Sequence, residues 1–60
     1  MILYRLVFKY DAFDNGKVIQ YSFDFDELNK IAKYLNDELE NNGWHGEYFV
    51  EEVNSKYVYK

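Results

Sequence analysis

The chain has 60 residues and no cysteine, and its eleven acidic and seven basic residues give a formal net charge of −4. A chain this short forms one domain at most, and without cysteine it has no disulfide and no thiolate zinc site to stabilise it. The acidic balance argues against direct binding of nucleic acid or of an anionic membrane, because both require basic patches. Aromatic side chains are 22% of the residues, and they are expected to supply the core.

The sequence shows no linker, no repeat and no low-complexity segment, so we expect one domain over residues 1–60. No stretch approaches the roughly 20 apolar residues of a membrane span. No basic segment followed by an apolar run opens the chain, as it does in a signal peptide. The expected location is therefore the cytoplasm, or the cytoplasm of the host cell if the source is a virus.

Residues 2–10 alternate in the manner of a β-strand, with Tyr4, Leu6, Phe8 and Tyr10 on one face. This face is purely apolar or aromatic, whereas the other face carries two cations. We therefore expect the aromatic face to contact the core.

A second strand is predicted over residues 17–23, because the Asn-Gly pair at 15–16 favours a turn before it. Simple alternation places Ile19, Tyr21 and Phe23 on one side of this strand. The two strands are expected to form a hairpin, with these three side chains facing the core.

The hydrophobic period changes to that of a helix over residues 24–42, where Leu28, Ile31, Leu35 and Leu39 share one face. This leucine-rich stripe is expected to cover the sheet.

Both ends of this helix carry recognisable capping residues. Asp24 is suited to the N-cap, and Glu27 stands three residues later, as in a capping box. Gly43 is expected to end the helix in the left-handed conformation. Capping also accounts for the carboxylate cluster of Asp24, Asp26 and Glu27, so this cluster is not interpreted as an acid–base pair.

Two further strands are predicted over residues 47–50 and 57–60, joined by the loop 51–56. The element order is then β-β-α-β-β, and one helix across a four-stranded sheet buries the most apolar surface. The predicted fold class is α+β, with a mixed sheet in which the first and last strands are central and parallel. This is the β-grasp arrangement.

In residues 42–60, Gly43, Gly46 and Glu47 precede an aromatic residue and an acidic six-residue loop, and Tyr57 follows. This pattern resembles the second hairpin of the immunoglobulin-binding domains of protein G, and more loosely those of protein L. The resemblance covers nearly the whole chain in topology and length, and it implies the same fold.

The antibody-binding surface of that family lies on the outer helix face and the start of the third strand. The resemblance implies a binding role for the corresponding positions here, which are Lys33, Asn36, Asp37 and Tyr48. Among these, only Lys33 keeps the family's residue type. Glu47 matches an accessory contact.

No arrangement typical of an enzyme is found in the sequence. Nucleophilic catalysis requires an activated Ser, Cys or Lys beside a base, and the serines are Ser22 and Ser55. His45 lies in a Trp-His-Gly connection without an evident acidic residue to orient it. We expect no catalysis, no cofactor and no metal site, beyond weak binding through His45 and Glu47.

The first candidate binding surface is the sheet face opposite the helix, which is expected to carry Leu3, Val7, Val18, Phe49 and Val58. An apolar patch with a charged rim is typical of an interface, whereas a solvated sheet face is normally polar. Strand propensity alone also favours Val and Phe at such positions. Homodimerisation would bury the same face.

The second candidate surface is acidic and comprises Asp37, Glu38, Glu40, Glu47, Glu51 and Glu52. Carboxylates spaced along a helix and a hairpin can imitate a phosphate backbone. The alternative is an ordinary solvated helix face.

The favoured interpretation is a small, non-catalytic protein-binding module. It would inhibit or assist a host protein that acts on nucleic acid, as small phage and mobile-element proteins do. The alternative is a structural or immunoglobulin-binding scaffold domain, engineered or self-associating. In both cases the expected partner is a protein, which includes a second copy of the chain.

Overall fold

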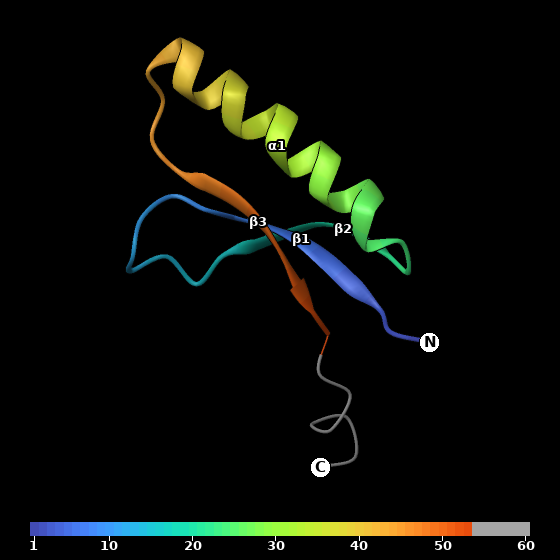
Figure 1. Ribbon diagram of the computed structural model, residues 1–60. Coiled ribbons are helices and arrows are strands. Elements are labelled where there is room, and N and C mark those ends of the chain that lie inside the picture. Colours follow the sequence, from blue (N-terminus) through green and yellow to red (C-terminus); the bar gives the residue numbers. More distant parts are fainter. Residues whose placement is uncertain (54–60) are drawn as a thin grey trace.

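The computed structural model describes residues 1–53 and contains three strands and one helix (Figure 1). The elements in chain order are β1 (Tyr4–Lys9), β2 (Lys17–Ser22), α1 (Phe25–Asn42) and β3 (Glu47–Glu52). The helix lies on one side of the sheet and contacts all three strands, β3 most extensively (Figure 1).

The sheet has the order β2-β1-β3, and β1 pairs antiparallel with both neighbours. The prediction of a four-stranded mixed sheet with β-β-α-β-β topology is therefore wrong. After the helix, the chain returns directly to the free edge of β1, where β3 places Tyr48 and Val50 on the same side as Leu6. The sequence prediction places the last strand, residues 57–60, beside β1, where the structure has β3. Residues 57–60 themselves lie outside the described residues.

The core is small and lies between α1 and the central strand. Leu6 and Leu28 are completely buried, and Ala32 lies beside them. Partly buried hydrophobic residues surround these three, namely Tyr4, Ile31, Leu35, Tyr48 and Val50. The predicted helical stripe thus faces the sheet, and the amphipathic pattern explains why.

The predicted caps of α1 are confirmed. The Asp24 carboxylate accepts the Glu27 N–H at 3.1 Å, and Gly43 ends the helix with a φ of 67°. The capping box is completed through a third residue, because the Asp24 N–H donates to the Ser22 hydroxyl at 3.0 Å. That hydroxyl in turn donates to the Glu27 carboxylate at 3.2 Å.

The prediction that Ile19, Tyr21 and Phe23 face the core is wrong, since they are 46%, 54% and 59% exposed. Ile19 is the extra residue of a β-bulge and has no partner in β1. One inserted residue reverses the inward and outward alternation of all positions beyond it. Tyr21 consequently pairs with Arg5, on the sheet face opposite α1.

The connection between β1 and β2 is organised by an aspartate. The Asp14 carboxylate accepts the N–H groups of Gly16 at 3.0 Å and Tyr10 at 2.8 Å. These bonds hold the pKa of Asp14 below its usual value, because they stabilise the charged form. Of the Asn15-Gly16 pair, only Gly16 has a positive φ, of 93°. Tyr10, which alternation assigned to the core, is exposed beyond the end of β1.

Candidate functional site

A groove follows the side of the domain where α1 runs along β3. Its first section has a volume of about 480 Å³ and is lined by Lys33, Asn36 and Asp37 from the helix and by Tyr48 and Val50 from the strand. Its second section has a volume of about 490 Å³ and continues toward the C-terminal end of the helix. Asn36 lines both sections, and together they are termed the α1–β3 groove.

Asn36 ties the helix to the edge of the sheet. Its side-chain Nδ2 donates to the Tyr48 carbonyl at 2.9 Å, and its Oδ1 accepts the Tyr48 N–H at 2.8 Å. The side-chain amide thus bonds both backbone groups of one β3 residue, as the peptide group of a neighbouring strand would. This clasp satisfies the strand edge at Tyr48 and divides the groove.

We expect Asn36→Ala to lower the free energy of unfolding by about 1–2 kcal/mol, because Tyr48 loses both partners in a partly buried place. The matched control is Asn42→Ala, which removes a single exposed bond from Asn42 to the Glu38 carbonyl. Its effect is expected within about 0.5 kcal/mol. Urea denaturation measures both, and equal losses in the two variants would contradict the structural role of the clasp.

Acidic side chains converge on the groove. Asp37 lines its first section, and Glu40 and Glu47 line its second section from the helix and the strand. Lys33 is the one cation among the described lining residues. Asp37 and Glu40 are neighbours on the helix surface at i and i+3. The charge of this groove is therefore negative.

The structure does not bring together all residues of the predicted acidic surface. Glu38 is exposed on α1 but does not line the groove. Glu51 accepts the Arg5 Nε–H at 2.7 Å on the sheet face opposite the helix, away from the groove, and both side chains of this ion pair stay partly exposed. Glu52 ends β3 in register with Tyr4. The acidic surface thus reduces to Asp37, Glu40 and Glu47 at the groove.

The sheet face opposite α1, here termed the open sheet face, carries an apolar row across all three strands. Val18, Val7 and Phe49 lie directly opposite one another in β2, β1 and β3. Val7 is only 4% exposed, because its neighbours cover it. Leu3 is half-buried at the end of the face, and Val58 lies outside the described residues.

A second row of the open sheet face is aromatic and ionic, with Tyr21 beside the Arg5–Glu51 pair. Sequence reasoning missed Tyr21 as a surface residue, because the bulge that turns it outward leaves no distinct signal in the strand sequence. Among residues 1–53, no element covers this face.

The four positions implied by the protein G resemblance lie together. Lys33, Asn36, Asp37 and Tyr48 all line the first section of the α1–β3 groove. The Asn36 amide is engaged with the backbone of Tyr48, so it is not available to a ligand. Lys33 and Asp37 remain exposed on the helix.

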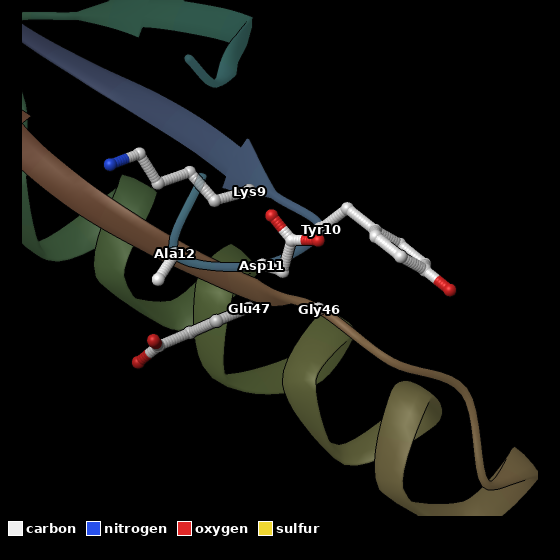
Figure 2. A pocket seen from close by; sticks show the side chains of 6 residues that line it. All are labelled: Lys9, Tyr10, Asp11, Ala12, Gly46 and Glu47. Atoms are coloured by element: carbon white, nitrogen blue, oxygen red, sulfur yellow. The ribbon is translucent and has the colours of Figure 1, made fainter. Parts of the chain in front are cut away.

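A third hollow, of about 370 Å³, lies where β1 ends and β3 begins (Figure 2). Lys9, Asp11 and Glu47 supply its charged groups, and the Tyr10 ring points away from Lys9 and Glu47 (Figure 2). His45 is not among the lining residues, and its ring centroid lies 6.1 Å from that of Tyr10. The described lining residues of this hollow include no serine and no histidine.

Two other kinds of site are absent from the described part of the chain. No group of three His, Asp or Glu residues within residues 1–53 is placed to hold a metal ion. The one helix found there, α1, lacks the apolar length needed to cross a membrane.

No protein-family model, no curated protein and no solved structure matches this chain. The α1–β3 groove and the open sheet face are therefore the features of this chain that point to a function.

Proposed function

We propose that this chain is a small, non-catalytic protein-binding module of the cytoplasm. It inhibits or assists a host protein that acts on nucleic acid, as small phage and mobile-element proteins do. Its acidic groove docks on the basic surface with which that protein binds phosphates.

The convergence of Asp37, Glu40 and Glu47 on the α1–β3 groove carries this proposal. These carboxylates come from two elements and flank a concave surface, with Lys33 as the one cation among the described lining residues. A net charge of −4 adds long-range attraction toward a basic partner. A nucleic-acid-binding surface supplies the complementary cations in high density.

The experiment compares two adjacent helix residues that carry the same charge. The immobilised chain is used to capture partners from a host lysate, with Asp37→Lys and Glu38→Lys as variants. Both substitutions change the net charge equally, but only Asp37 lines the groove. We expect Asp37→Lys to weaken retention of the partner by about tenfold or more, and Glu38→Lys by about twofold at most.

Two results would contradict the proposal. Equal weakening by Asp37→Lys and Glu38→Lys would show that general charge, not the groove, determines binding. A DNA or RNA oligonucleotide is also expected to displace the chain from the captured partner, since both use the same basic surface. A partner that binds the chain and the oligonucleotide simultaneously would exclude mimicry of nucleic acid.

Self-association through the open sheet face is the alternative that the apolar row favours. The three strands have six residues each. At strand and residue spacings of about 4.8 and 3.3 Å, they cover roughly 300 Å² in projection. A standard interface buries about 800 Å² on each partner. By this projected area, the three described strands alone fall short of a standard interface, and we favour the groove.

A further inference from the structure

The hydrogen-bonding pattern of β3 determines which of its backbone groups point away from the sheet. The Val53 N–H donates to the Leu3 carbonyl at 2.8 Å, so the alternate residues Glu51 and Phe49 also bond to β1. The backbone groups of Tyr48, Val50 and Glu52 then point away from β1. The Asn36 bonds to Tyr48 agree with this assignment.

Among residues 1–53, the outer edge of β3 is therefore closed at Tyr48 and open at Val50 and Glu52. Asn36 occupies both backbone groups of Tyr48. The outward N–H and C=O groups of Val50 and Glu52 have no hydrogen-bond partner among residues 1–53. An open strand edge of this kind is a template for pairing with another chain.

We propose that the β3 edge from Val50 to Glu52 accepts an extended, basic segment of the partner protein as an added strand. This inference rests on the proposed function, and it specifies how part of the partner is held. Main-chain hydrogen bonds supply affinity in such strand addition, and alternate side chains supply specificity. The segment is short, because the Asn36 clasp blocks pairing beyond Val50.

The charges around the edge determine the chemistry of the added segment. Its side chains on the helix side lie next to Glu52 and to Val50, which lines the first section of the groove together with Asp37. Its side chains on the other side lie next to Phe49 and Glu51. Lys or Arg alternating with apolar residues matches both sides.

A second copy of this chain fits the edge poorly. Antiparallel pairing of two β3 strands centred on Glu51 places each Glu51 opposite its counterpart, and Val50 opposite Glu52. Like charges directly opposite destabilise a strand pair. A basic segment from a different protein avoids this repulsion.

The test uses the full chain, labelled with ¹⁵N, and the peptide acetyl-Lys-Val-Lys-Val-Lys-Val-amide. Saturating peptide is expected to shift the Val50 and Glu52 amide resonances and to slow their hydrogen exchange by about tenfold. The Tyr48 amide is expected to keep its exchange rate, because Asn36 already bonds it. The matched probe is the same peptide with its backbone N-methylated at alternate residues. This peptide keeps its charge but loses the backbone N–H donors that would pair with β3. It is expected to bind about tenfold more weakly.

A protein variant gives a second measurement. Glu52→Pro removes an outward N–H, and the bonds between β1 and β3 are retained because the Glu52 N–H points away from β1. We expect this variant to bind the unmethylated peptide about tenfold more weakly while its amide spectrum elsewhere stays folded.

Three outcomes would overturn the added strand. The first is equal binding of the methylated and unmethylated peptides. The second is protection of the Val50 and Glu52 amides in the free chain, which would show that the edge is already covered. The third is the absence of any binding by the unmethylated peptide. In each case the proposed function still stands if Asp37→Lys, and not Glu38→Lys, releases the captured partner. The proposed function fails separately if Asp37→Lys and Glu38→Lys weaken retention of the partner equally.

Discussion

Leu28→Ala is expected to lower the free energy of unfolding by about 2–5 kcal/mol. Leu28 is completely buried, and it packs with Leu6 and Ala32 at the centre of the core. A core of this size supplies a net stability on the order of 3–5 kcal/mol, so the loss removes most of it. Urea denaturation followed by far-UV circular dichroism measures the change, and much of the variant should be unfolded before urea is added.

The matched control is Leu35→Ala, because the same side chain is truncated on the same helical stripe. Leu35 is only partly buried at the margin of the core. Less apolar surface is removed from contact there, so a smaller loss of about 1–2 kcal/mol is expected. A loss at Leu35 equal to or larger than that at Leu28 would show that the core is centred elsewhere along α1.

Gly46→Ala is expected to lower the free energy of unfolding by about 2–4 kcal/mol. Gly46 has a φ of 119°, a conformation that residues with a side chain rarely adopt. A Cβ atom at this position would also lie 2.5 Å from two atoms of the Phe8 ring. Phe8 cannot retreat freely, because its ring packs on Tyr48 with a centroid separation of 4.8 Å.

Gly43→Ala separates the two causes of this loss. Gly43 also has a positive φ, of 67°, but among the described residues no atom beyond its chain neighbours and the last helical turn would lie within 4 Å of a Cβ at this position. Its substitution is therefore expected to cost about 1 kcal/mol, from the left-handed conformation alone. Thermal unfolding of both variants measures the difference, and equal losses would contradict the close approach of Gly46 to Phe8.

The helix was predictable from the sequence because its determinants are local. The apolar spacing from Leu28 to Leu39 defines the buried face, and Asp24 and Gly43 define the ends. Each of these signals acts within a few residues, so no knowledge of the rest of the fold is needed. The Ser22 hydroxyl that completes the capping box depends on the preceding strand and was not foreseen.

The sheet was less predictable because strand order and register depend on distant residues. The bulge at Ile19 arises in the pairing between β1 and β2, and it turns Tyr21 to the open sheet face. The pairing of β3 with β1 depends on the edge of β1 that β2 leaves unpaired, which lies beside the chain as it leaves α1. Neither choice is determined by the composition of one strand.

The candidate site was predicted in part. The resemblance grouped Lys33, Asn36, Asp37 and Tyr48, and the structure places these residues along one groove. The clasp between the Asn36 side chain and the Tyr48 backbone could not be foreseen, because it requires the packing distance between α1 and β3. The sequence alone groups Glu51 with the acidic surface. Its ion pair with Arg5 could not be foreseen, because it depends on the register that places the two residues opposite each other in the sheet.

The groove, the clasp and the open strand edge all require that β3 lies antiparallel beside β1. A NOESY spectrum of the full chain tests this placement most directly, because the Cα atoms of non-hydrogen-bonded antiparallel pairs are only about 4.5 Å apart. We predict cross-peaks between the Hα protons of Leu6 and Val50 and between those of Phe8 and Tyr48. Their absence, with contacts from β1 to residues 57–60 in their place, would contradict the sheet order and both proposals that depend on it.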